Sequence, residues 1–181
     1  MGAGVCGFHD VAPERRDGPP SRGNAYPMPL LAVTDLKSGL GRDQRLLGLD
    51  LGTKTIGLAL SDVSRTIASP LTTIARTKFT RDVQDLFKVI EAHDVGGLVL
   101  GLPVSMDGTE GPRCQSTRQF ATNLLALRDL PLTFWDERLS TAAVTRTLLE
   151  ADASRRRRAE VVDKMAAAYI LQGALDACPT A

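Results

Sequence analysis

Acidic side chains occupy three places in the sequence where a carboxylate is well placed to do chemistry. Asp50 interrupts a run of leucines that predicts a buried strand, where its charge loses hydration unless a cation or hydrogen-bond donors compensate. Asp136 and Glu137 directly follow another apolar stretch, and ligand sites gather at the carboxyl ends of parallel strands. Asp163 borders the apolar face of a helical stretch that turns by about 100° per residue.

Each acid also has an ordinary structural alternative. Asp50 could turn a hairpin by accepting hydrogen bonds from backbone amides. The 136/137 pair could meet Arg138 at a solvated strand exit, and Asp163 could stabilise its helix through the dipole. The acids nevertheless come from three separate elements, and each stands at an element edge or on a buried face. This coincidence favours one shared catalytic site.

A shared cluster of carboxylates repels itself unless divalent cations neutralise it. Mg²⁺ prefers oxygen ligands. The chain has only two histidines, neither close to the acids in sequence, which disfavours an imidazole-rich zinc or iron site. Three carboxylates without histidine suit two-metal phosphoryl transfer, in which ions about 3.5–4 Å apart activate a water and stabilise the leaving oxygen. We predict Asp50, Glu137 and Asp163 as ligands, with Asp136 as the alternative to Glu137, whose longer side chain can reach back from just past the strand end.

Apolar patterning predicts the elements that must position these acids. Short apolar runs predict strands over residues 45–51, 55–61, 66–74, 97–100 and 132–135. Amphipathic spacing, alanine content or an N-cap signal predicts helices over residues 80–93, 115–127, 140–150 and 159–176. We expect a polar, glycine-rich loop over 101–114 and a basic connector over 152–158. Pro70 places the third strand at a sheet edge.

The order of these elements predicts an α/β fold. Adjacent early strands suit an antiparallel meander, whereas the later alternation needs parallel crossovers, so a mixed five-stranded sheet with helices on both faces is expected. Residues 45–178 form the one domain. Residues 1–44 hold 5 of the 10 prolines and 7 of the 16 glycines, which favours a mobile extension. The alternative is a short edge strand at Leu30, Leu31 and Val33.

Composition and charge exclude several classes of protein. The chain has no uncharged apolar run of about 18 residues, so we expect no membrane span. Three cysteines without paired spacing argue against a disulfide framework or a thiolate zinc site and favour a cytoplasmic protein. The formal net charge is only +1, so phosphates can be held only by local clusters. The densest basic run is Arg155, Arg156, Arg157 and Arg158.

Four motifs in order resemble the RuvX/YqgF family, known as Holliday junction resolvase-like nucleases. Residues 50–59 (DLGTKTIGLA) resemble its D-x-G-x-K-x-x-G-x-A opening, and residues 101–113 its G-L-P…D-G loop. Residues 136–141 (DERLST) resemble its D-E-R-L-T-T segment, and residues 162–172 resemble its final helix. The resemblance covers about 45–176, and the departures from the family pattern remove no acid.

The resemblance implies a ribonuclease H-like fold and a nuclease that uses Mg²⁺ or Mn²⁺. Asp50, one acid of the 136/137 pair, and Asp163 match the family's acidic positions. The family's reported roles are cutting branched DNA and maturing the 5′ end of precursor 16S rRNA, and the sequence leaves both open. A homodimer would suit symmetric cleavage of a DNA junction.

Basic side chains near the acids are candidate contacts for nucleic acid. Lys54 follows Asp50 closely and could contact a scissile phosphate, and the amides of the 101–111 loop could hold a phosphate ahead of a helix. Arg113, Arg138 and the run 155–158 could contact the nucleic-acid backbone. For Lys54 and for the run 155–158, the plain alternative is a solvated surface role.

Two other functional classes compete with the nuclease. Residues 50–53 also resemble the phosphate loop of actin-like ATPases and sugar kinases, but those need two lobes, and the motif is not repeated. A non-catalytic nucleic-acid or protein-binding module on the same fold is expected to lack one acid, whereas all are present. Metal-dependent cleavage by the purified protein separates this module from the enzyme.

Overall fold

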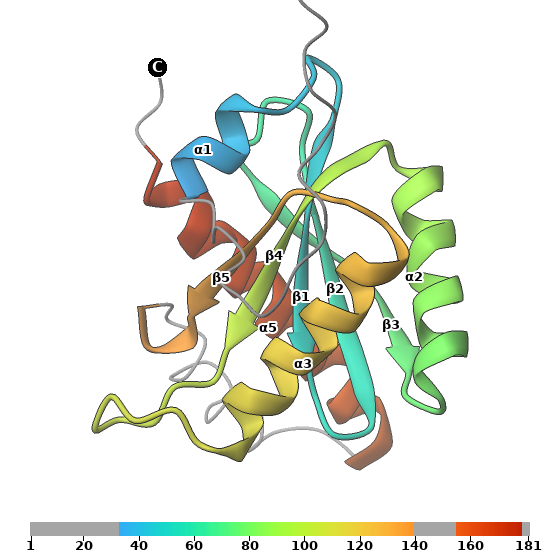
Figure 1. Cartoon of the computed structure of the whole chain (residues 1–181), viewed down its shortest axis with the longest axis vertical. Helices are drawn as coiled ribbons and strands as arrows, with labels where there is room; N and C mark the ends of the chain where they lie inside the picture. The colour runs from blue at the N-terminus through green and yellow to red at the C-terminus, as the bar shows by residue number, and fades with distance from the viewer. Residues whose placement is uncertain (1–32, 140–154, 179–181) are drawn as a thin grey trace, which may run out of the picture.

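The computed structural model describes residues 33–139 and 155–178 (Figure 1), and it describes the side chains of residues 33–139 and 164–178. One five-stranded sheet has the order β3-β2-β1-β4-β5. The strands are β1 (Arg45–Leu51), β2 (Thr55–Ser61), β3 (Ala68–Ala75), β4 (Val95–Leu102) and β5 (Leu132–Asp136). β1, β2 and β3 pair antiparallel, whereas β1, β4 and β5 pair parallel. This is the predicted mixed five-stranded sheet, with the strand that contains Pro70 at its edge.

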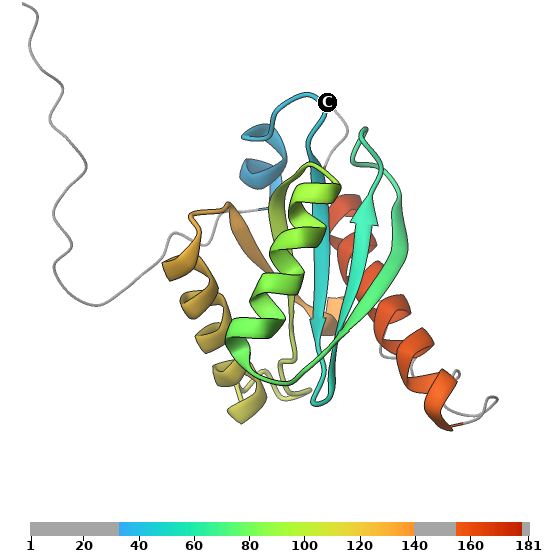
Figure 2. The same cartoon turned by 90° about the vertical axis from the view of Figure 1, so that its right-hand side faces the viewer.

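Helices cover both faces of the sheet (Figure 2). They are α1 (Val33–Ser38), α2 (Phe79–Ala92), α3 (Pro112–Leu127), the 3-10 helix η1 (Glu137–Leu139) and α5 (Arg155–Asp176). α2 and α3 pack on the face that carries Leu47 and Leu49, whereas α1 and α5 pack on the face that carries Leu46 and Val99. Among the described residues, no helix is long and apolar enough to cross a bilayer.

Gly48 lets α5 approach the middle of the sheet closely. A Cβ on Gly48 would lie 2.7 Å from Cβ of Leu171 and 2.9 Å from the carbonyl oxygen of Ala167. Backbone atoms cannot move aside as the end of a flexible side chain can, so only glycine fits here. Because side chains alternate along a strand, Asp50 projects from the same face of β1 as Gly48.

Helix α1 moves the boundary of the segment that the sequence predicts to be a mobile extension, because residues 33–44 pack on the sheet. Leu36 of this helix is only 1% exposed, and it fills the space above Gly97 of β4. Val33 and Leu40 pack in the same cluster, so residues 33–44 belong to the packed domain and Val33 is helical rather than part of an edge strand. The cause is the spacing of Val33 and Leu36 on one face of the short helix, with Leu40 two residues beyond its end. Leu30 and Leu31 lie outside the described residues.

Several element boundaries also differ from prediction. α3 begins at Pro112 because proline suits the first turn of a helix. β4 extends to Leu102, and every one of its residues is buried. Arg155–Arg158 form the first turn of α5 instead of a connector, since arginine is a good helix former. The helix predicted over 140–150 lies outside the described residues.

Candidate active site

The end of β1 places Asp50 in the interior of the protein. Asp50 pairs with Gly57 of β2 and is only 1% exposed. It faces the side of the sheet on which α5 packs, two residues beyond the close approach at Gly48. A buried carboxylate in this position is expensive unless cations or hydrogen-bond donors stabilise its charge.

Glu137 begins η1 directly after β5, and its side chain reaches back over the sheet. Its Oε1 atom lies 2.8 Å from the point that a Cβ on Gly101 would occupy. Leu49 of β1 pairs with Leu100 of β4, so Asp50 and Gly101 are the next residues along these two parallel strands. A Cβ on Gly101 would also meet α5, which places it on the face of Asp50. Asp50 and Glu137 therefore come together at one end and on one face of the sheet.

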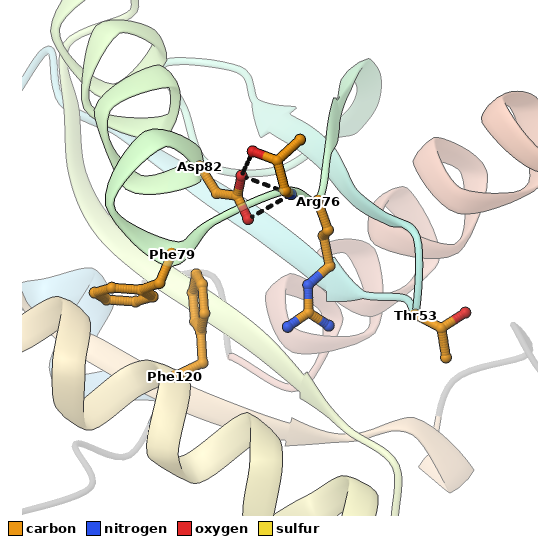
Figure 3. A pocket seen from close by; sticks show the side chains of 6 residues that line it. Thr53, Arg76, Phe79, Asp82 and Phe120 are labelled. Carbon is orange, nitrogen blue, oxygen red and sulfur yellow. Dashed lines mark hydrogen bonds between the residues drawn. The ribbon is translucent and has the colours of Figure 1, made fainter.

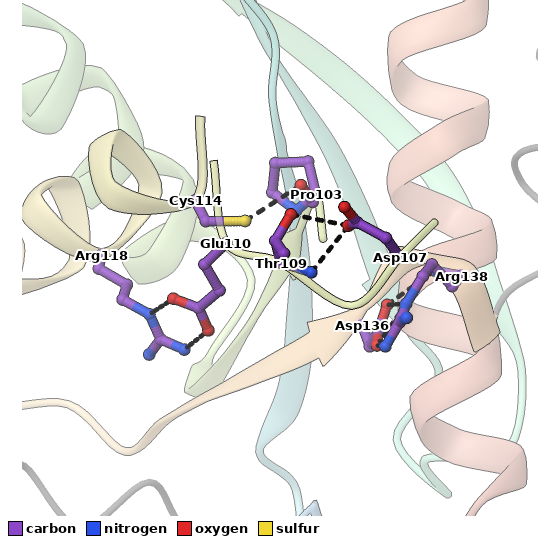
Figure 4. Close-up of polar contacts among 8 residues, drawn as sticks. All are labelled: Pro103, Asp107, Thr109, Glu110, Cys114, Arg118, Asp136 and Arg138. Atoms are coloured by element: carbon purple, nitrogen blue, oxygen red, sulfur yellow. Dashed lines mark hydrogen bonds and ion pairs between the residues drawn. The ribbon is translucent and has the colours of Figure 1, made fainter. Parts of the chain in front are cut away.

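Asp136 is engaged by Arg138 (Figure 4). Nε of Arg138 donates to Oδ1 and Oδ2 of Asp136 at 3.1 and 3.0 Å, and Nη2 donates to Oδ2 at 2.6 Å. The backbone amide of Arg138 adds a hydrogen bond of 3.0 Å to Oδ1. Hydrogen bonding to Arg138 holds the pKa of Asp136 below its ordinary value, against the opposing effect of burial. Asp136, the last residue of β5, thus stabilises the turn, and Glu137 is the acid of the pair whose side chain extends over Gly101 toward Asp50.

The loop 103–111 is organised by its own polar groups. Oδ1 of Asp107 accepts from the amide of Thr109 at 2.9 Å and from its hydroxyl at 2.7 Å. The amides of Ser105 and Gly108 donate to the carbonyls of Thr109 and Ser105, and Gly108 has the positive φ of 86° that favours glycine. The amides of 105, 108 and 109 therefore bond within the loop rather than facing a phosphate, contrary to the sequence expectation for them.

Contacts on both sides fix this loop next to β5. Nε of Arg118 in α3 donates to Oε2 of Glu110 at 2.8 Å, and the same guanidinium lies 5.0 Å from the ring centre of Phe134 in β5. The Cys114 thiol donates to the carbonyl of Pro103 at 3.0 Å, and burial raises the pKa of this thiol. The edge of the site next to Glu137 is therefore tied to the core of the domain.

Asp163 is a residue of helix α5, one helical turn before Ala167. The backbone of Ala167 packs on Gly48. The side chain of Asp163 is outside the described ones, so its place in the cluster stays a prediction. Within the described residues, no three histidine, cysteine, aspartate or glutamate side chains gather closely enough to hold a metal ion.

The predicted basic contacts have different settings. Lys54 is exposed in the turn between β1 and β2, and Arg113 is exposed in the first turn of α3. Arg138 forms the ion pair with Asp136. The side chains of the run 155–158 lie outside the described ones. Lys54 and Arg113 are thus accessible to a nucleic-acid backbone, whereas Arg138 also has a structural task.

Arg76 is a basic residue that the sequence did not single out. It directly follows β3, and its Nη1 donates to the carbonyl of Gly52 at 2.7 Å. Its amide donates to the carbonyl of Lys54 at 2.8 Å. Arg76 is therefore hydrogen-bonded to the turn that follows Asp50 through both its side chain and its backbone amide. Only the pairing of β2 with β3 brings it there, and no local sequence signal marks it.

Comparisons with known proteins show the family to which the chain is similar. Residues 44–177 match the family model described as "RuvX: Holliday junction resolvase". A protein of Paramagnetospirillum magneticum, named "Putative pre-16S rRNA nuclease", is 74% identical over 149 residues, which are 82% of this chain and 96% of that protein. A protein of the same name from Rhodospirillum rubrum is 64% identical over 151 residues, 83% of this chain and 94% of that protein.

One solved structure that the chain resembles is that of "T. thermophilus RuvC in complex with Holliday junction substrate", at a TM-score of 0.48 and 14% identity, covering 74% of this chain and 94% of that one. The 149 residues shared with the P. magneticum protein exceed the 137 residues that follow position 44. The shared region therefore begins before Arg45, in agreement with the packing of α1. The RuvX family model matches residues 44–177, which are most of the chain. The chain therefore belongs to the RuvX family.

Proposed function

We propose that this chain is a metal-dependent endonuclease in which Asp50, Glu137 and Asp163 hold Mg²⁺ or Mn²⁺. The observation that carries the proposal is the meeting of buried Asp50 with Glu137 across Gly101. The donor set fits the metal, because hard divalent cations take carboxylate oxygens as ligands. Two neighbouring carboxylates at the carboxyl end of parallel strands would repel each other without a cation.

Different residues of the chain have different roles in the proposed hydrolysis. When bound, the ions supply a nucleophilic water and stabilise charge on the leaving oxygen. Asp50 and Glu137 hold their carboxylates at one end of the sheet, and Lys54, on the exposed turn beside Asp50, contacts the phosphate to be cut. Asp136 and Arg138 are positioning residues, because their ion pair holds the turn that keeps Glu137 above Gly101.

The substrate we propose is the 5′ end of precursor 16S rRNA, cut in the cytoplasm. Support comes from relatives that match more than 90% of their own length and are named for this activity. The family model's description supports a second substrate, the Holliday junction, with a role in DNA recombination and repair. Symmetric cleavage of a junction calls for two copies of the chain, whereas cleavage of a single RNA end does not.

A side-by-side assay decides between the two substrates. Purified full-length protein is offered a precursor 16S rRNA fragment and a synthetic four-way junction, each with Mg²⁺, with Mn²⁺ and with chelator. We expect metal-dependent cleavage near the mature 5′ end of the RNA and little cleavage of the junction. Preferred cutting of the junction by a dimer would assign the second substrate. Metal-independent binding without cleavage of either would assign the non-catalytic module.

A further inference from the structure

A pocket of about 390 Å³ opens beside the turn that follows Asp50 (Figure 3). Its walls come from the β1–β2 turn, the segment between β3 and α2, the first turn of α2, and α3. The lining residues are Thr53, Arg76, Thr77, Phe79, Asp82 and Phe120. Asp50 does not line this pocket, because it projects from the opposite face of the sheet, toward α5.

Arg76 supplies the positive charge of the pocket. Figure 3 shows its guanidinium extending into the space between Phe120 and Thr53. A guanidinium has five N–H donors, and the hydrogen bond to the carbonyl of Gly52 fixes its orientation with one of them. Among the described side chains, no acid forms an ion pair with Arg76. The guanidinium is thus held in position with donors directed to the pocket.

The one acid in the lining is directed away from Arg76. Oδ1 and Oδ2 of Asp82 accept from the amide of Thr77 at 3.0 and 3.2 Å, and Oδ1 also accepts from the Thr77 hydroxyl at 3.0 Å. Asp82 is 5% exposed, and its carboxylate is stabilised by these hydrogen bonds from Thr77. The contact fixes the corner between β3 and α2, which is the segment that carries Arg76.

Aromatic rings form the apolar wall of the pocket. Phe79 and Phe120 meet edge to face, with ring centres 5.6 Å apart and planes at 82°. Phe120 is buried, whereas Phe79 is half-buried and offers surface to a ligand. A guanidinium, an exposed threonine hydroxyl and an accessible ring are the groups that bind the phosphate and the base of a nucleotide.

The pocket lies close to the place where the backbone would be cut. Gly52, whose carbonyl accepts the hydrogen bond from Arg76, is two residues beyond Asp50, and its amide donates to the carbonyl of Asp50 at 3.2 Å. Thr53 and Lys54 are exposed on the β1–β2 turn, so a nucleic-acid strand bound with its scissile phosphate at Asp50 and Glu137 would have an open path over this turn toward Arg76.

We propose that this pocket binds one nucleotide of the substrate strand that flanks the cut, with its phosphate on Arg76 and Thr53 and its base against Phe79. The inference rests on the proposed nuclease function for its position relative to the cut. The pocket's affinity for a single strand is independent of cleavage and can be measured separately.

The first test measures binding of a single-stranded RNA 12-mer to the full-length chain in chelator, over a series of salt concentrations. Arg76→Ala is expected to bind about tenfold more weakly at low salt, because a charge-assisted contact is lost, and to reduce the slope of log affinity against log salt by about 0.7. The matched control is Arg42→Ala, which removes the same charge from the exposed segment before β1. Equal effects of the two variants would overturn the proposal.

Further variants separate the pocket from general stability. Thr53→Val removes a hydroxyl and Phe79→Leu removes a ring, and neither changes the charge. Both variants are expected to weaken binding at an unchanged salt slope, because the contacts they remove are uncharged. Thermal unfolding of each variant shows whether the fold persists. An Arg76→Lys variant, which keeps the charge, should retain the salt slope but lose part of the affinity. An affinity of Arg76→Ala equal to that of the wild type at every salt concentration would contradict the proposal.

The second test locates the pocket relative to the cut. Substrates with a single neutral methylphosphonate linkage at successive positions are cleaved by wild type and by Arg76→Ala. We expect one linkage beside the cut to slow the wild type and to have no further effect on Arg76→Ala. Equal sensitivity of both proteins at every position would refute the placement. If neither protein cleaves any substrate, the nuclease proposal fails, and the binding series still decides whether the pocket holds a nucleotide.

Discussion

The carboxylate of Glu137 occupies the space that a side chain on Gly101 would need. Oε1 of Glu137 lies 2.8 Å from the Cβ position of Gly101. Because Gly101 of β4 has no side chain, Glu137 can extend from the end of β5 toward Asp50 near the end of β1. The glycine is therefore part of the site although it has no functional group.

Gly101→Ala is expected to abolish most nuclease activity at a moderate cost in stability. The new methyl group meets Glu137 and the flexible end of Ile170 at 2.5 Å, and overpacking of this kind costs about 1–3 kcal/mol. Gly97→Ala is the matched control, because its Cβ also meets side-chain ends, of Leu36 and Leu46 at 2.9 and 3.0 Å, far from Glu137. Denaturant unfolding and cleavage rates are measured for both. Equal activity losses in the two variants would rule out a special role for Gly101.

Glu137→Gln should reduce cleavage far more than Asp136→Asn. Glu137 reaches the sheet beside Asp50, whereas Asp136 acts through its ion pair with Arg138. Asp136→Asn keeps the shape of the side chain and weakens the turn, so its loss should be partly restored by higher metal concentration. Initial rates over a Mg²⁺ titration distinguish the two variants. The opposite ranking would move the ligand to Asp136.

Deleting residues 1–44 should lower the melting temperature markedly more than deleting residues 1–32. The longer deletion removes α1 and Leu36, and removal of a buried leucine side chain alone costs about 2–5 kcal/mol. A Leu36→Ala variant of the full chain should reproduce most of the difference. Identical melting curves for the two deletions would show that α1 adds nothing to the stability of the domain.

Asp62 should make the stability of the domain sensitive to acid. Burial raises the pKa of Asp62, but hydrogen bonds from the Ser64 hydroxyl and from the amides of Ile67 and Thr66 outweigh burial and lower the pKa to about 2. A carboxylate with a lowered folded-state pKa stabilises the fold above its ordinary pKa of about 4, and this stabilisation is lost as the pH falls toward 2. Urea unfolding from pH 7 to pH 2 is therefore expected to show a gap between wild type and Asp62→Asn that narrows below about pH 4. A gap that stays constant over this range would contradict the assignment.

Much of this architecture follows from local patterns. The apolar runs predict β1, β2 and β4 because these central strands are buried on both faces, and shorter apolar segments mark the edge strands β3 and β5. The order of the elements then restricts the sheet to a mixed one. Helix α1 escapes prediction because only three apolar residues mark it, inside a segment rich in proline and glycine. Its fold depends on tertiary contacts with β4, which no local pattern reveals.

The sequence supplies the residue types of the proposed site but not its geometry. The position of Asp50 in a leucine run identifies it, because a buried charge needs a reason. The choice of Glu137 over Asp136 depends on how Arg138 folds back, and the roles of Gly101 and Arg76 depend on which strands become neighbours. The contacts of Gly101 and Arg76 join residues far apart in sequence, and they appear only once the sheet is assembled.

The central claim is that Asp50 and Glu137 cut nucleic acid through a divalent metal. The most direct measurement is the cleavage rate of precursor 16S rRNA by wild type and by Asp50→Asn over a Mg²⁺ titration, with thermal unfolding of both proteins in the same buffers. We predict a rate at least roughly 100-fold lower for Asp50→Asn, together with a melting temperature that Mg²⁺ raises in the wild type only. Wild-type cleavage and the same Mg²⁺ dependence in folded Asp50→Asn would contradict the claim.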